Sequence, residues 1–141
     1  MQNFENHRRW NPLHHFVAAP LAYGAGIWTL VRFVTAPSVD SLLMTVIGLG
    51  LATSTLVARA EALTVQNRVI RLEMALRCAR ILPHDLASRV HELRLRQIIA
   101  LRFAGDAELA DLVRRTLAGE FATNRDIKRA IRDWQPDYLR V

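Results

Sequence analysis

Residues 66–76 read QNRVIRLEMAL, a charged helical pattern that follows an apolar run without a break. The apolar residues around it repeat at spacings of four, three, four and three: Val65, Val69, Leu72, Leu76 and Ala79. This is the a/d repeat of a helix that packs lengthwise against another helix. No glycine or proline occurs between Leu51 and Leu82, so we expect one continuous helix from about Leu42 to Leu82.

A second apolar stripe lies beside this repeat and consists of Leu63, Ile70, Met74 and Ile81. A helix with apolar residues on two sides needs more than one partner to cover them. We expect the C-terminal part of the chain to cover one stripe and another subunit to cover the other. The first repeat is therefore the predicted assembly surface, and we call it the seam: Val65, Val69, Leu72, Leu76 and Ala79.

The N-terminal third of the 141-residue chain is apolar, whereas the rest is charged and basic. Between His15 and Ala58 the only charged residues are Arg32 and Asp40. Residues 16–34 and 41–58 are each apolar enough to cross a hydrocarbon core about 30 Å thick once their flanks are included. The turn-rich sequence TAPSVDS joins them, which predicts an antiparallel hairpin of two membrane spans.

A cleaved signal peptide is the competing interpretation of the first apolar run, with residues 7–9 (HRR) as its basic region. Three features favour the hairpin. Arg32 interrupts the run, Pro37 follows the only plausible cleavage site, and the second apolar run follows at once.

Basic residues flank the two apolar runs on one side. Arg8 and Arg9 precede the first run, Arg59 follows the second, and the loop between them has no arginine or lysine. Because such residues are enriched on the cytoplasmic side, we expect both termini in the cytoplasm and the loop between the spans outside. Trp10 and Trp28 fall near the two interfaces, and the basic flanks would attract anionic lipid headgroups.

Small residues occur four apart in both apolar runs, as Ala22 with Gly26 and Gly48 with Ala52. Such pairs let helix backbones approach each other closely. We interpret them as contacts between the two spans, with contact to another subunit as the alternative.

The predicted fold class is all-α. The hairpin's second helix continues into a cytoplasmic helical module, in which three short helices fold against the long one. Apolar residues recur at helical spacing within 84–104, 106–120 and 124–134, and Thr123 with Asp126 resembles a capping box before the last of these helices. The expected segments are an N-terminal flank (1–12), a first span (13–35), a loop (36–40), a second span (41–58), a charged extension (59–82) and three short helices (83–141).

No pattern typical of an enzyme or of a cofactor site occurs, so we assign no catalytic, cofactor-binding or metal residue. The single cysteine, Cys78, excludes an internal disulfide and a cysteine metal cluster. The five histidines include no HxxxH or HExxH pair, and there is no glycine-rich phosphate loop. Acids and arginines alternate in residues 125–133, which is typical of a solvated helix surface and does not favour nucleic-acid binding.

Three functional interpretations follow. The first is a non-enzymatic interaction protein assembled through the seam, either a homo-oligomeric scaffold or an accessory subunit of a larger inner-membrane complex. The second is an oligomeric pore or transport component lined by residues of the second span: Thr45, Gly48, Thr53 and Thr55. The third, the least favoured, is a redox or quinone-binding subunit that uses His14 and His15.

Four segments together resemble a family of small bacterial integral membrane proteins that is a domain of unknown function: FENHRRWNPLHHFV (4–17), QNRVIRLEMALR (66–77), LRQIIALRFAGDAELADLVRR (95–115) and IKRAIRDWQPDYLRV (127–141). The resemblance covers the chain from Asn3 to Val141 and implies two spans and a helical tail, but no activity. Acidic residues often stand in that family at the positions of Asn67 and Met74 here. If this region makes ion pairs between subunits, this chain therefore makes fewer of them.

Overall fold

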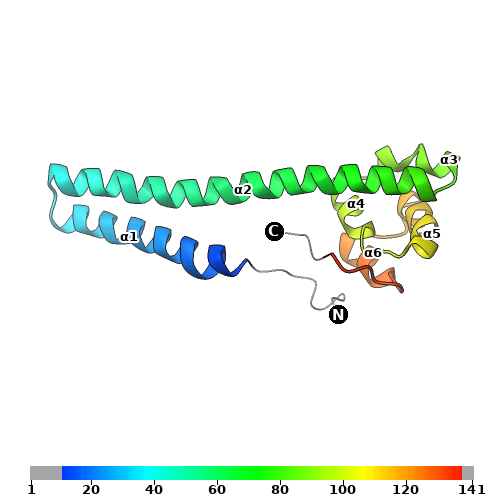
Figure 1. The fold of residues 1–141 in the computed structure, drawn as a ribbon. Coiled ribbons are helices and arrows are strands. Elements are labelled where there is room, and N and C mark those ends of the chain that lie inside the picture. Colours follow the sequence, from blue (N-terminus) through cyan, green and yellow to red (C-terminus); the bar gives the residue numbers. More distant parts are fainter. Residues whose placement is uncertain (1–10, 138–141) are drawn as a thin grey trace. The chain divides into compact units, whose positions relative to one another are not determined.

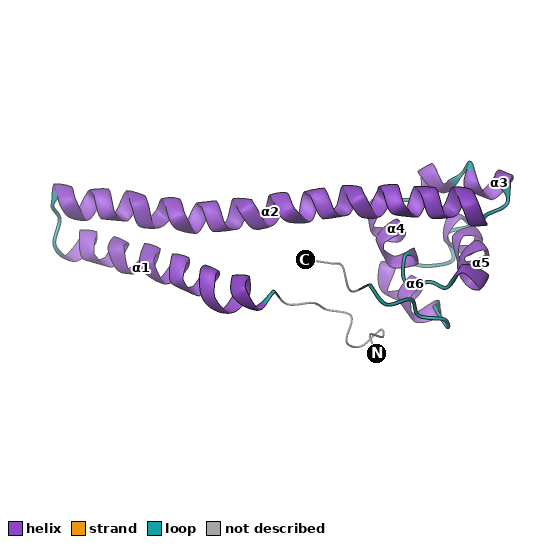
Figure 2. Cartoon of the chain, in the orientation of Figure 1, coloured by secondary structure: helices purple, strands orange, loops and turns teal. Residues whose placement is uncertain are grey.

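The computed structural model describes residues 11–137, and its fold is all-α (Figure 1, Figure 2). The elements in chain order are the π-helix η1 (His14–Ala18), α1 (Ala19–Thr35), α2 (Val39–Ile81), α3 (His84–Ala87), the 3-10 helix η2 (Val90–Glu92), α4 (Leu95–Leu101), α5 (Asp106–Leu117) and α6 (Asn124–Ala130). Contacts divide the chain into two compact units, which are described separately. Within the described residues these are the hairpin unit (11–64) and the C-terminal module (65–137).

Helix α2 is one uninterrupted helix of 43 residues that contributes to both units. It lacks a break because its interior has glycine only at positions 48 and 50 and has no proline. The long helix expected from about Leu42 to Leu82 is therefore present and begins three residues earlier, at Val39.

In the hairpin unit, α1 and the first part of α2 run antiparallel beside each other (Figure 1). The loop between them is held by two serines: the Ser41 hydroxyl donates to the carbonyl of Ala36 at 3.1 Å, and the N–H of Ser38 donates to that hydroxyl at 2.9 Å. Farther along, the Thr45 hydroxyl donates to the carbonyl of Thr29 across the helix pair at 2.9 Å. Residues 14–35 and α2 are each long and apolar enough to span a membrane.

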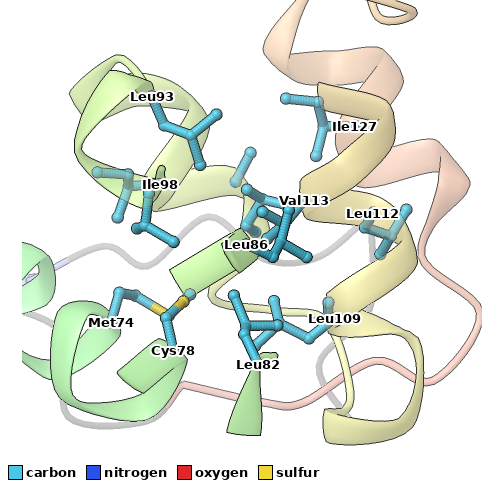
Figure 3. Close-up of a cluster of buried hydrophobic side chains, with 14 of the residues drawn as sticks. Met74, Cys78, Leu82, Leu86, Leu93, Ile98, Leu109, Leu112, Val113 and Ile127 are labelled. Atoms are coloured by element: carbon cyan, nitrogen blue, oxygen red, sulfur yellow. The ribbon is translucent and has the colours of Figure 1, made fainter. Parts of the chain in front are cut away.

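The C-terminal module encloses a hydrophobic core between the last part of α2 and the short helices α3 to α6 (Figure 3). Its most deeply buried side chains come from the short helices and the segment after α4: Leu101, Phe103, Leu109, Val113 and Ile127. Fully burying a side chain of this size is worth roughly 1.5–3 kcal/mol, so this core supplies the main stabilisation of the module.

The structure divides residues 84–104, which we expected to form one helix, into α3, η2 and α4. The chain is extended at Leu93 and Arg94, where ψ is 137° and 147°. The N–H of Arg94 then donates to the Gln97 side chain at 2.8 Å, which caps α4. In one straight helix Leu86 and Ile98 would point about 120° apart at roughly 100° per residue. The break lets both side chains enter the same core.

Helix α6 also ends earlier than the helical spacing of residues 127–134 predicts. It stops at Ala130, and Trp134 instead forms a bridge with Ala104 and stacks on Phe103, with ring centroids 4.6 Å apart. The N–H of Gly105 donates to the carbonyl of Asp133 at 2.8 Å. A Cβ atom at position 105 would overlap the Asp133 side chain, so any larger residue here would force that side chain to move.

Candidate assembly interface

In the C-terminal module, one face of α2 is covered by the short helices. The covered residues follow one another at four-residue intervals and are 2–7% exposed: Ile70, Met74, Cys78 and Leu82. Figure 3 shows the last three directed toward side chains of the short helices, including Leu86 and Leu109. We call these four residues the covered stripe.

The seam lies on another face of the same helix and remains open. Its larger members are 48–65% exposed: Val65, Val69, Leu72 and Leu76. Ala79 is exposed as well. Met74 follows Leu72 by two residues, which places it about 200° farther round the helix. The covered stripe and the seam therefore point in nearly opposite directions.

The covered stripe is predicted in part by the sequence pattern. Ile70 and Met74 belong to it, as proposed, whereas Leu63 and Ile81 are only half-buried. Cys78 and Leu82 were not included, although their spacing of four residues from Met74 was a usable signal. Burial raises the pKa of the Cys78 thiol, and the neighbouring Arg77 opposes that shift in part.

Arg77 joins α2 to the other helices of the module through hydrogen bonds. The sequence pattern did not predict this role. Its guanidinium donates to the carboxylate of Asp106, with Nε at 2.8 Å, and also to the carbonyl oxygens of Arg102 and Ala104, at 3.2 Å and 2.6 Å. These two carbonyl groups lie just after α4, outside a regular helix. The Arg77 side chain therefore supplies hydrogen bonds that a helix would not provide there. This contact joins α2 to the segment between α4 and α5.

In the hairpin unit, the predicted small residues lie between the two helices. Gly26 and Gly48 are buried, and Ala22 and Ala52 are half-buried. A Cβ atom on Gly48 would lie 3.2 Å from the Cα atom of Gly26, so the two backbones touch at this point. The small residues therefore contribute to the contact between α1 and α2 of the same chain.

The structure places the remaining predicted residues as follows. Trp28 is exposed near the middle of α1, and Arg59 is half-buried on α2. The interface residues Arg8, Arg9 and Trp10 lie outside the described residues.

The predicted pore-lining residues divide into two groups. Thr45 and Gly48 are buried against α1, whereas Thr53 is exposed and Thr55 is half-buried. Two of the four therefore already contact α1 inside the hairpin.

His14 and His15, the candidate redox residues, lie side by side in η1 with ring centroids 5.0 Å apart. Backbone and side-chain groups of Asn11 contact both: the N–H of His14 donates to its amide oxygen at 3.2 Å, and Nδ1 of His15 lies 2.9 Å from its carbonyl oxygen. Among residues 11–137, no group of three or more histidine, cysteine or acidic side chains is close enough to hold a metal ion.

Comparison with known proteins places the chain in a family. A search of curated proteins and a search of solved structures each found no similar protein. A family model, however, matches residues 1–141, so the predicted full-length resemblance to a family of unknown function is confirmed. The chain belongs to a family of unknown function, DUF6526, over its full length.

Proposed function

We propose that this protein is a non-enzymatic membrane interaction protein that self-associates through the seam of α2. The observation that carries the proposal is the contrast between the two faces of that helix. The short helices cover one apolar stripe, while Val65, Val69, Leu72 and Leu76 remain exposed on the nearly opposite face. A contiguous apolar surface of this kind is typical of an interaction site.

The hairpin supports placement in a membrane. Its large apolar side chains are mostly exposed, among them Leu21, Ile27, Leu43, Val46 and Ile47. In water each would forgo the roughly 1.5–3 kcal/mol that burial provides. A bilayer covers all of them without a second protein layer. With the basic flanks on the cytoplasmic side, the module would lie in the cytoplasm of a bacterium, below its inner membrane.

The contacts inside the hairpin favour this function over a pore. A pore needs small and polar residues that face a channel, but Thr45 and Gly48 already pack against α1. The seam, in contrast, has no occupant within the described chain. Self-association would give a scaffold, and association with a different protein would give an accessory subunit of a larger complex.

Native mass spectrometry of gently extracted, C-terminally tagged protein tests this function. We expect an integer multiple of 16.0 kDa. A second polypeptide present in stoichiometric amount would instead indicate that the protein is an accessory subunit of a larger complex.

Leu72→Asp should yield the monomer mass while the protein stays in the membrane fraction, because a charge in the seam cannot be buried unpaired. Arg71→Asp, in the same turn but off the seam, is the matched control. An unchanged mass for Leu72→Asp would overturn the proposal.

A further inference from the structure

Charged residues flank the seam of α2 on both sides. In the heptad register of the seam, Val65, Leu72 and Ala79 occupy d positions, and Val69 and Leu76 occupy a positions. Arg68 then occupies a g position, and Glu73 occupies the e position five residues later. In a parallel two-stranded coiled coil, each g side chain meets the e side chain of the following heptad on the other helix.

Both charged side chains are available for such a contact. Arg68 and Glu73 are exposed on α2, and neither forms a salt bridge or side-chain hydrogen bond with another residue in 11–137. The neighbouring g-to-e combinations are Glu61 with Gln66 and Ala75 with Arg80. None of these combinations places like charges together, so a parallel pairing meets no repulsion along this edge.

One pair of core positions favours two helices. Val69 at a and Leu72 at d follow the two-strand combination, a β-branched residue at a with leucine at d, whereas Leu76 at a and Val65 and Ala79 at d do not follow it. The short helices cover the nearly opposite face of α2, so the seam itself is open to a second helix.

We propose that two copies of this chain pair in parallel and in register along α2, with Arg68 of each copy bound to Glu73 of the partner subunit. This inference rests on the proposed function, because insertion of the hairpin in one membrane makes the α2 helices of all copies point the same way. The seam from Val65 to Ala79 is only about 21 Å long at 1.5 Å per residue. Two circumstances offset this short length: α2 is already folded, and the membrane confines the copies to a high effective concentration.

A charge-reversal cycle tests the pairing. The full chain, labelled with donor or acceptor dyes, is reconstituted in lipid vesicles, and the dimer dissociation constant is measured by energy transfer as lipid dilutes the protein. Arg68→Glu and Glu73→Arg should each weaken dimerisation about tenfold, since both symmetric ion pairs become repulsive. The double variant should return to within about threefold of the wild type, because the pairs re-form with exchanged signs.

Two controls make the result decisive. Arg71→Glu changes an exposed charge outside the predicted g and e positions and should leave the dissociation constant unchanged. Circular dichroism should give the same helix content for every variant, because all the changed residues are exposed. If the wild type gives no energy transfer, the proposed function fails together with this inference. If the wild type associates but single reversals have no effect, or the double variant does not recover, only the parallel register is overturned.

Discussion

Helix α2 carries two apolar faces that meet different surroundings in the C-terminal module. Met74 belongs to the face that the short helices cover, and Leu72, two residues earlier, belongs to the face that they leave open. The two side chains have similar hydrophobicity and lie in the same helical turn. Hydrophobic pattern alone therefore shows that a face needs a partner, whereas the tertiary structure shows whether that partner is in the same chain.

The largest expected effect comes from the covered face. Met74→Ala should lower the free energy of unfolding of the module by about 2–5 kcal/mol, because it removes atoms from a packed core. Leu72→Ala should change it by less than about 0.5 kcal/mol in the monomer, since the side chain is exposed. Thermal unfolding in detergent, at dilutions where the protein is monomeric, measures both. Equal decreases in the free energy of unfolding for Met74→Ala and Leu72→Ala would contradict the difference between the two faces.

Two glycines of the hairpin also differ in their surroundings, one facing α1 and the other facing open space. A Cβ atom on Gly48 would lie 2.6 Å from the Thr29 hydroxyl oxygen, whereas one on Gly50 meets nothing within 4 Å. Gly48→Ala should therefore destabilise the packing of α1 on α2 by about 1–3 kcal/mol. Gly50→Ala should be neutral or stabilise the helix by up to about 1 kcal/mol. The measurement is the distance between spin labels on the two helices. A hairpin that is unaffected by Gly48→Ala would refute the contact.

The smallest effect concerns the pH dependence of the module. The hydroxyl and the N–H of Thr123, which both donate to the Asp126 carboxylate, hold the pKa of that carboxyl below its usual value near 3.9. A carboxyl whose folded pKa is depressed stabilises the fold above its unfolded pKa, and this contribution is lost as the pH falls through the folded pKa. The Tm should therefore decrease as the pH is lowered below about 4. Thr123→Val should reduce that decrease, and Asp126→Asn should remove this contribution. An acid-induced change in Tm identical to that of the wild type in both variants would exclude a role for this pair.

Much of the fold could be predicted from the sequence because it depends on local pattern. The continuous α2 followed from the absence of helix breakers, and the all-α class followed from helical spacing throughout. The Thr123 cap of α6, read from the spacing of Thr123 and Asp126, is present with a side-chain hydrogen bond. These features depend on residues within one or two turns of each other.

The features that were missed depend on residues far apart in the chain. The bridge between Ala104 and Trp134 and the hydrogen bonds of Arg77 to residues 102–106 join segments separated by 25 residues or more. Helical spacing over residues 127–134 indicated a longer α6, but the pairing and stacking of Trp134 override that local preference. The pattern of a single sequence does not show which distant segments pair with each other or in what register.

The central claim is that the open face of α2 binds a second copy, and oxidative crosslinking in native membranes tests it most directly. Leu72→Cys places a thiol in the seam, Arg71→Cys places one beside it, and the wild type contains only the buried Cys78. We expect a covalent dimer near twice 16.0 kDa to form rapidly for Leu72→Cys, slowly for Arg71→Cys, and not for the wild type. Crosslinking of Leu72→Cys no faster than that of Arg71→Cys would contradict the account.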